Sequence, residues 1–408
     1  MNFLLRRLAA SVSAAAIISA LSLGLLAASA AAAPLTAGNL VVERLGDGST
    51  TLSSAAAAIS ALEYTTAGSS VQTIVAFPTT GSDRQSDSGS ATSDGYLNSF
   101  NGFISVPGYN NAVGTASVAS QNTKVNSIIG TSGTVVNRTL FPTSGTMPFT
   151  ANNYRSSIAT SGSTFYAAST GTPSSTGGAW YFDGTAFTQV SSTAAGQATN
   201  LRNVEIYNNQ LYTSSGASTG YGIWSVGSGL PTATGQSTTL LINASLAGTG
   251  NGSPYGFVMF DTNNDSTLDL AYVADDRTSA GGGIQKWTFN GSAWSNSWAL
   301  LVGASGTSTL QSGTGAGFAG LRGLAGTYDA VSGATLFATT TETTNNRLIS
   351  ILDTGRTTPS TYATLQAAGA NYVFRGVDVI TVPEPASLAA LGCAAAAAAI
   401  LGRRRARR

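Results

Sequence analysis

The 408-residue chain has no histidine, one cysteine and two lysines, and only 9% of its residues are charged. Without histidine it cannot form a Ser-His-Asp or Cys-His nucleophile pair, a histidine metal ligand or an imidazole acid–base group. One cysteine excludes an intramolecular disulfide and a thiolate zinc site. Carboxylates, tyrosine, lysine and arginine are therefore the remaining candidates for catalysis.

The 19 basic residues are unevenly placed along the chain. Seven of them lie at the two ends: Arg6, Arg7, Arg403, Arg404, Arg405, Arg407 and Arg408. From Glu43 to Glu384 the chain has 12 basic and 18 acidic residues, a net charge of −6. This balance argues against nucleic acid as a partner. The hydrophobic fraction of 42% is enough for a core, so general disorder is not expected.

The first 30 residues have the three parts of a secretory signal peptide. Arg6 and Arg7 form a short basic region, and the apolar stretch 8–26 follows. Small residues come next, with Ala28 and Ala30 flanking Ser29 as the expected cleavage region. We predict export by the general secretory machinery, with a retained membrane anchor as the alternative, since 19 apolar residues are long enough to span a bilayer.

Residues 382–408 also divide into three parts. Pro383-Glu384-Pro385 comes first, the apolar run 386–401 follows, and the arginine cluster given above ends the chain. Sixteen residues of helix are about 24 Å long, slightly shorter than a hydrocarbon core. The arginines would stay cytoplasmic under the positive-inside rule, which places the body of the protein outside.

The order of these three parts resembles the PEP-CTERM sorting signal of Gram-negative bacteria. The resemblance implies a short transmembrane helix and cleavage near Pro383-Glu384-Pro385 by the membrane protease exosortase. It also implies a destination at the cell surface or in the extracellular matrix, in a group of proteins linked to exopolysaccharide and biofilm. An ordinary tail anchor is the alternative.

Between the ends, residues 35–381 contain a repeated pattern. An apolar or aromatic residue, often followed by arginine, begins a strand that a turn and further strands follow. Equivalent positions lie 47 to 66 residues apart, a length that suits four short strands: 98, 155, 202, 256, 322 and 375. Three third strands carry tryptophan at one position, namely Trp180, Trp224 and Trp287. Residues 55–62 are a local helix candidate, with a strand as the rival.

The last copy, 374–380, has one strand and then stops at Pro383. Residues 39–45, 58–64 and 71–77 read as the three strands that this copy lacks. Pairing of the last strand with the first would close a ring and remove exposed sheet edges. We therefore predict an all-β propeller of six four-stranded blades, loosely similar to bacterial secreted β-propellers. Seven blades, a β-sandwich and a β-helix are the alternatives.

One loop has the oxygen spacing of a cation site. Asp261, Asn263, Asp265 and Asp269 lie at relative positions 1, 3, 5 and 9, and Ca²⁺ takes six to eight oxygen ligands. The loop resembles the calcium loops of integrin-type propellers, which implies bound Ca²⁺. Ser266, however, stands where glycine usually permits the sharp turn. A polar hairpin turn without a cation is the alternative.

The repeated arginines have two interpretations. Arg155, Arg202, Arg322 and Arg375 would either bind an anionic ligand at the centre or bond blade carbonyls and a nearby acid such as Glu205 or Asp378. We favour the structural role. The tryptophans likewise suit blade packing better than sugar stacking.

These patterns predict an exported, non-enzymatic propeller that binds polysaccharide or other surface proteins. No catalytic residue is assigned. The alternative is a carbohydrate-active enzyme that uses two carboxylates, for which Glu205, Glu342, Asp353 and Asp378 are candidates. A structural filler of the outer layer without a ligand is the third interpretation.

Overall fold

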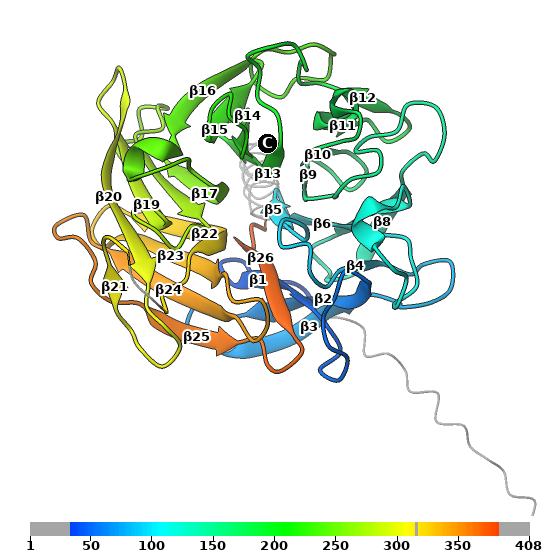
Figure 1. Cartoon of the computed structure of the whole chain (residues 1–408), viewed down its shortest axis with the longest axis horizontal. Helices are drawn as coiled ribbons and strands as arrows, with labels where there is room; N and C mark the ends of the chain where they lie inside the picture. Colours follow the sequence, from blue (N-terminus) through cyan, green and yellow to red (C-terminus); the bar gives the residue numbers. More distant parts are fainter. Residues whose placement is uncertain (1–32, 315–316, 383–408) are drawn as a thin grey trace, which may run out of the picture. The chain divides into compact units, whose positions relative to one another are not determined.

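A computed structural model of the protein describes residues 33–314 and 317–382. These residues form antiparallel sheets in a propeller-like arrangement around a common centre (Figure 1). The helical parts described are three short 3₁₀ turns: Val118–Ser120, Ser174–Thr176 and Ala244–Ala247. No helix in this part of the chain is long and apolar enough to cross a membrane. The predicted signal peptide, the sorting motif Pro383-Glu384-Pro385 and the arginine cluster lie outside the described residues.

Three sheets have the four strands expected of a blade. Their strands are β9 (Ser156–Ala159), β10 (Phe165–Ser169), β11 (Gly178–Phe182) and β12 (Phe187–Gln189); β13 (Leu201–Tyr207), β14 (Gln210–Ser215), β15 (Gly222–Val226) and β16 (Thr238–Asn243); and β22 (Leu321–Asp329), β23 (Gly333–Thr340), β24 (Arg347–Asp353) and β25 (Ala363–Ala367). A fourth sheet has five strands: β17 (Pro254–Phe260), β18 (Leu270–Asp275), β19 (Gly283–Phe289), β20 (Trp294–Val302) and β21 (Leu310–Gln311).

The remaining strands form one nine-stranded sheet, in the order β26-β1-β2-β4-β6-β7-β8, with β3 on β2 and β5 on β6. Their bounds are β1 (Leu40–Leu45), β2 (Ala56–Tyr64), β3 (Ser70–Ala76), β4 (Ser86–Ser88), β5 (Asn98–Phe100), β6 (Phe103–Tyr109), β7 (Lys124–Ile129), β8 (Val135–Leu140) and β26 (Val373–Val379). The predicted pairing of the last strand with the first is present, because Leu40 lies opposite Val379 and Val42 opposite Val377. Residues 55–62, for which the sequence allowed a helix or a strand, contribute to the strand β2.

The sheet count differs from the six separate sheets predicted. The hydrogen bonds define five sheets, of which four have four or five strands. The cause is β4, which pairs with β2 on one side and with β6 on the other. This three-residue strand joins the first and second repeats into one sheet.

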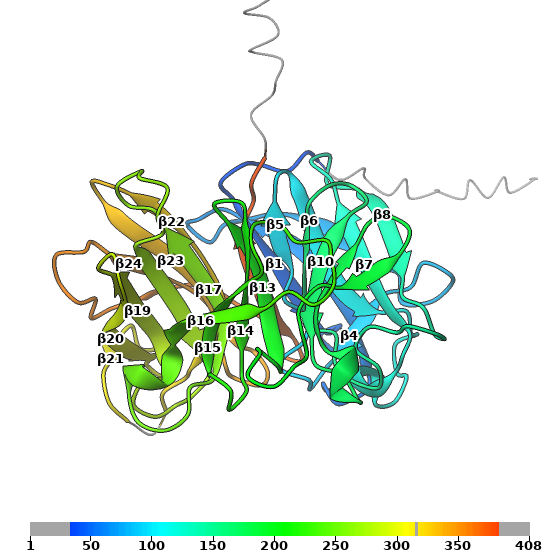
Figure 2. The same cartoon turned by 90° about the horizontal axis from the view of Figure 1, so that it is seen from above.

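Six strands surround the centre: β26, β5, β9, β13, β17 and β22. Each contacts the next, and β22 contacts β26, so that the cycle closes. Figure 2 shows the strands running between two faces, with β26 close to the centre. Glycine permits the tight packing, since a Cβ on Gly376 would lie 2.6 Å from the backbone N of Leu97 in the neighbouring segment.

The hydrophobic core lies between neighbouring sheets. Trp180, Trp224 and Trp287 are all almost fully buried in their third strands. Their indole N–H groups donate to nearby groups of the same segment: Gly177 O and Gly220 O, just before the third strand, and Gln285 Oε1, within it. The predicted packing role of these tryptophans is confirmed.

Candidate functional site

The repeated arginines lie where the inner strands begin, and they tie neighbouring strands together. Arg155 Nη1 donates to Leu201 O, Arg202 Nη1 to Pro254 O, and Arg375 Nη2 to Ser88 O. Arg322 instead binds the carboxylate of Asp276, at 3.2 Å. The structural interpretation is confirmed, but the acid was wrongly named, because the partner is Asp276 rather than Glu205 or Asp378.

A β-bulge lies at two of these arginines, Arg202 and Arg322. The pairing register shifts between Leu201 and Val204 in β13 and between Leu321 and Leu324 in β22. β17 has the same shift, and its register puts Tyr255 in the place of arginine, one residue before the position 256 predicted from the sequence. A bulge adds one residue to a strand and redirects its side chain.

A buried carboxyl cluster lies beside Arg375. Glu43, Asp87 and Asp94 are each fully buried, and both carboxyl oxygens of Glu43 have no hydrogen-bond partner among the described residues. Burial raises the pKa of each carboxyl; Arg375 opposes this rise for Glu43, as the hydroxyl of Tyr109 does for Asp94. The fold therefore favours neutral acids here.

A second carboxyl pair, Glu205 and Asp378, lies further along the inner strands. Asn203 Nδ2 donates to Glu205 Oε1, and Ser99 N donates to Asp378 Oδ2 at 2.6 Å. Burial raises the pKa of Asp378 to about 7, and burial with the nearby Asp378 charge raises the pKa of Glu205 well above its usual range. The structure thus brings together two of the four carboxylates that sequence suggested for catalysis.

The other two candidates lie apart from this pair. Glu342 binds Arg347 at 2.6 Å. Asp353 binds Lys286 at 2.7 Å, between β24 and β19. Each is therefore in an ion pair with a cation of its own.

The predicted calcium loop connects β17 to β18, and its side-chain oxygens accept N–H groups of the loop itself. Asp261 accepts Asp265 N and Ser266 N, Asn263 accepts Asp265 N, and Asp269 accepts Thr262 N. Within the described part of the chain, no group of three or more Asp, Glu, His or Cys side chains is placed to hold a metal ion. These hydrogen bonds favour the turn interpretation, and calcium binding stays a prediction.

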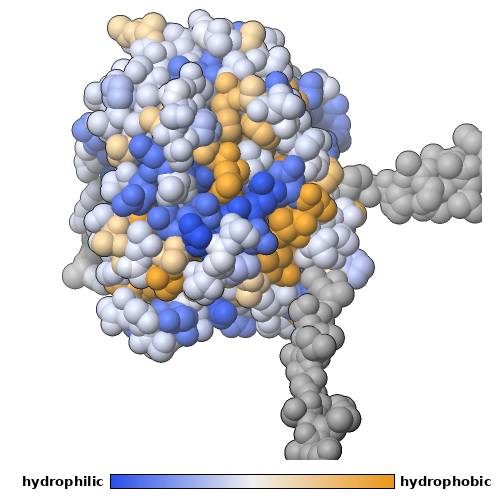
Figure 3. Space-filling model, turned by 90° about the vertical axis from the view of Figure 1, so that its right-hand side faces the viewer, coloured by the Kyte–Doolittle hydropathy of each residue, from blue (hydrophilic) through white to orange (hydrophobic). Residues whose placement is uncertain are grey.

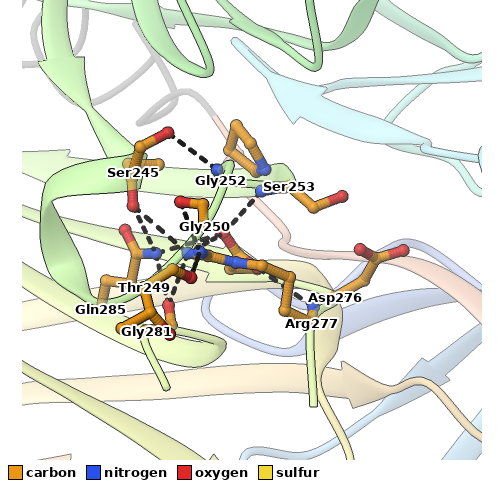
Figure 4. Close-up of polar contacts among 12 residues, drawn as sticks. Ser245, Thr249, Gly250, Gly252, Ser253, Asp276, Arg277, Gly281 and Gln285 are labelled. Carbon is orange, nitrogen blue, oxygen red and sulfur yellow. Dashed lines mark hydrogen bonds and ion pairs between the residues drawn. The ribbon is translucent and has the colours of Figure 1, made fainter. Parts of the chain in front are cut away.

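Figure 4 shows another polar cluster, built around Arg277. Its guanidinium binds Asp275 through two oxygens, at 2.8 and 2.9 Å, and donates to the carbonyls of Thr249 and Gly281. Gln285 Nε2 also donates to Gly281 O. The guanidinium is engaged with these partners, so the cluster fixes the loop before β17 and is not a ligand site.

The face that carries β8 has apolar patches beside a hydrophilic band (Figure 3). A cavity of about 420 Å³ lies there, between the outer strands β3 and β8. Val135 and Val136 line it and are 40% and 50% exposed, while Arg138 and Asp83 supply charge at its border. Single exposed apolar residues are normal on a surface, and nothing in the structure indicates an occupant.

An open groove with a volume of about 740 Å³ lies between the sheet β13–β16 and the sheet β17–β21. No charged side chain lines it. Its lining consists of aromatic, aliphatic, amide and hydroxyl side chains: Asn208, Gln210, Tyr212, Leu240, Leu241, Met259, Ser266, Thr267, Leu268, Phe289, Ser292, Ala293 and Trp294.

Three aromatic rings supply the apolar surface of this groove. Phe289 and Trp294 pack with ring centroids 5.4 Å apart, and Tyr212 lies in the opposite wall. Among the described residues, neither the Trp294 indole N–H nor the Tyr212 hydroxyl has a hydrogen-bond partner, and Trp294 is half-buried. An aromatic face next to unused polar groups can bind a ligand that is apolar on one side and hydroxylated on the other.

Sequence reasoning missed this groove as a site. The available signal was the difference between two classes of tryptophan: Trp294 follows the Asn290-Gly291 turn on a fourth strand, whereas the repeated tryptophans are on third strands. A fourth strand is the outer strand of a blade, where a large aromatic residue is not needed for the core.

No protein-family model matches the chain, and no curated protein matches its sequence. Among solved structures, a nidogen/laminin complex is 11% identical, with a TM-score of 0.46 over 84% of this chain and 99% of that chain. A putative 6-phosphogluconolactonase from Bacteroides uniformis is 12% identical, with a TM-score of 0.40 over 80% and 82%. The GH74 enzyme of Niastella koreensis is 13% identical, with a TM-score of 0.39 over 78% and 46%. Likenesses this distant say nothing about activity.

Proposed function

We propose that the protein is exported to the cell surface or extracellular matrix of a Gram-negative bacterium and is processed there by exosortase. The support is the order of features at the two ends, together with the net charge of −6 between them. The fold is compatible with both cleavages, because its first strand begins at Leu40 and its last strand ends at Val379. Neither cleavage would remove a strand of the part of the chain that the structure describes.

The proposed body has six blades. The nine-stranded sheet then consists of two blades, β26-β1-β2-β3 and β5-β6-β7-β8, which β4 joins. The six inner strands that contact one another in a closed cycle support this division. A four-stranded unit around each inner strand matches the architecture of propellers.

The function that the geometry supports best is non-enzymatic binding of a polysaccharide, and the observation that carries it is the uncharged aromatic groove. Sugar rings present C–H faces that pack on Trp294 and Phe289, while their hydroxyl groups meet the polar groups of Tyr212 and Asn208. The absence of charged lining favours a neutral glycan. The strongly shifted carboxyls do not line this groove.

Binding is tested with the full-length protein on an array of neutral and uronic-acid oligosaccharides. We expect neutral glycans to give the signal and Trp294→Ala to reduce it at least about tenfold, since stacking residues dominate such sites. Val331→Ala is the control, because this side chain is 84% exposed and lies outside the groove. An unchanged signal in Trp294→Ala would contradict the assignment.

Processing is tested by mass spectrometry of the protein from cells with and without exosortase. We expect loss of the tail beyond Pro385 in the first strain only. Replacing Pro383-Glu384-Pro385 by alanines should leave the tail in place, and identical masses in all three samples would contradict the proposal.

A second candidate function, a carboxylate-dependent carbohydrate-active enzyme, has one observation in its favour: Glu205 and Asp378 lie near each other on the inner strands, and burial raises the pKa of both carboxyls. One protonated and one ionised carboxyl is the state that glycoside hydrolysis needs. Release of reducing ends from the cell's own polysaccharide, lost in both Glu205→Gln and Asp378→Asn, would support this function over binding alone.

A further inference from the structure

A second cavity, of about 330 Å³, lies on the other side of the β17–β18 loop, between the sheets β17–β21 and β22–β25. It differs from the groove in chemistry, because it contains an ammonium group and two carboxylates. The side chains that matter here are Thr262, Asp269, Tyr272, Lys286, Phe289 and Asp353.

Lys286 brings free hydrogen-bond donors to this cavity. Its Nζ lies 2.7 Å from Asp353 Oδ2, and its side chain is 13% exposed. The Tyr272 hydroxyl donates to the same oxygen at 2.6 Å, and Gly355 N donates to Asp353 Oδ1. Asp353 is thereby held in place. The ammonium, which has three donors, also lies 6.0 and 5.9 Å from the ring centroids of Tyr272 and Trp298, but it has no second hydrogen-bond acceptor among the described residues.

Asp269 brings acceptors to the same cavity. Its two oxygens accept the backbone N–H and the hydroxyl of Thr262, at 3.0 and 2.8 Å. An ionised carboxylate has about four lone-pair directions, so each oxygen can accept another hydrogen bond. A hydroxyl group both donates and accepts, which matches a wall with free donors and free acceptors.

The two cavities are neighbours. Leu268, in the β17–β18 loop, lines the groove, and the next residue, Asp269, lines the second cavity. Phe289 lines both. A linear glycan that crosses the tip of this hairpin would therefore meet the groove first and the charged cavity next.

We propose that the cavity around Lys286 and Asp269 is a second sugar subsite, which binds the hydroxyl groups of the same neutral polysaccharide that the groove holds. This inference rests on the proposed polysaccharide binding and adds the chain length and charge of the ligand. With two carboxylates and one ammonium the cavity has a net charge of −1, which disfavours uronic acids.

The test uses the full-length protein on immobilised neutral and uronic-acid oligosaccharides of two and six sugar units. We expect the neutral hexasaccharides to bind at least about tenfold more tightly than the disaccharides. Lys286→Met and Asp269→Asn should each lower hexasaccharide affinity to the disaccharide level and leave disaccharide binding unchanged. Lys286→Arg keeps the charge and should retain most of the difference.

The outcomes separate the two proposals. If Trp294→Ala abolishes binding while Lys286→Met and Asp269→Asn bind hexasaccharides like the wild type, the second subsite is wrong and the groove stands. A preference for uronic acids also contradicts the second subsite. Absence of any glycan signal contradicts both proposals. Thermal unfolding of each variant checks that it is folded. If Lys286→Met does not fold, Asp269→Asn is the variant that decides.

Discussion

Nδ2 of Asn98 lies 3.2 Å from Oδ1 of Asn203, a hydrogen bond between two inner strands that have β9 between them in the cycle. The same nitrogen also donates to Ser157 O and Val204 O, at 2.9 and 3.1 Å. One amide therefore connects three inner strands, and Asn98 is only 2% exposed. We infer that this side chain closes the centre and holds the neighbouring strands in register.

Asn98→Ala should lower the free energy of unfolding by about 1–3 kcal/mol, because it removes both N–H donors of a buried amide and leaves buried acceptors without a partner. Asn98→Asp should be worse, because a carboxylate cannot donate to the acceptors that now face Nδ2. Urea denaturation measures both changes. Thr364→Ala, at an exposed position of β25, is the control and should change stability by less than about 0.5 kcal/mol. Equal stability of Asn98→Ala and the control would show that the central amide is dispensable.

The strands could be predicted from sequence because they depend on the local alternation of apolar and polar residues. The ring closure could be predicted because the last repeat lacks three strands that the N-terminal segment supplies. The contact of Asn98 with Asn203 could not, since it joins positions 105 residues apart and only three-dimensional closure brings them together. The short strand β4 was missed for a similar reason. Three polar residues, Ser86–Ser88, carry no apolar pattern and become a strand through their neighbours.

The close packing of the inner strands at Gly376 predicts that no larger side chain fits at this position. A Cβ on Gly376 would lie 2.6 Å from Leu97 N and 2.9 Å from both Gly95 O and Tyr96 Cα, all backbone atoms that cannot move independently. Gly376→Ala should therefore lower the free energy of unfolding by about 1–3 kcal/mol through overpacking. Thermal unfolding is the measurement, and a melting temperature equal to that of the wild type would mean that the inner strands can separate without cost.

The Glu205–Asp378 pair predicts that stability falls as pH rises. The folded pKa of Asp378 is about 7 against 3.8 for a free aspartate, and that of Glu205 is also raised, so the fold favours the protonated forms. Their contribution is complete below the unfolded pKa and is lost as pH rises through about 7. In Asp378→Asn the fall in the free energy of unfolding between pH 5 and 8, measured by urea denaturation, should be shallower by at most about 1.4 kcal/mol per pH unit.

Asp329→Asn is the control for this prediction. Backbone N–H groups of Ser332 and Val331 lower the pKa of Asp329, so its contribution is lost only as pH falls below the normal range of aspartate. Its pH profile between 5 and 8 should therefore match that of the wild type. A wild-type midpoint that stays constant from pH 5 to 8 would contradict the assigned direction for the carboxyl pair.

For the candidate site, sequence pointed to a loop that lines it, but for its calcium-type oxygen spacing and not for sugar binding. Residues 261–269 were singled out for their oxygen spacing, and they form the wall between the groove and the cavity around Lys286 and Asp269. The spacing of Lys286 and Asp353, 67 positions apart, contains no signal for their ion pair. Such contacts arise from the packing of one sheet against the next, which a repeat pattern alone does not specify.

The β17–β18 loop gives the last prediction. Ser266 has φ +71°, in the left-handed region that favours glycine, and its N–H donates to Asp261 Oδ2 at 2.7 Å. Ser266→Gly should stabilise the protein by up to about 1 kcal/mol, and Asp261→Ala should destabilise it by about 1 kcal/mol. Because the loop's own N–H groups occupy these oxygens, we expect millimolar Ca²⁺ to leave the melting temperatures of the wild type and of both variants unchanged. A Ca²⁺-dependent rise in the wild type that is absent in Asp261→Ala would instead establish the calcium site, by preferential binding to the folded state.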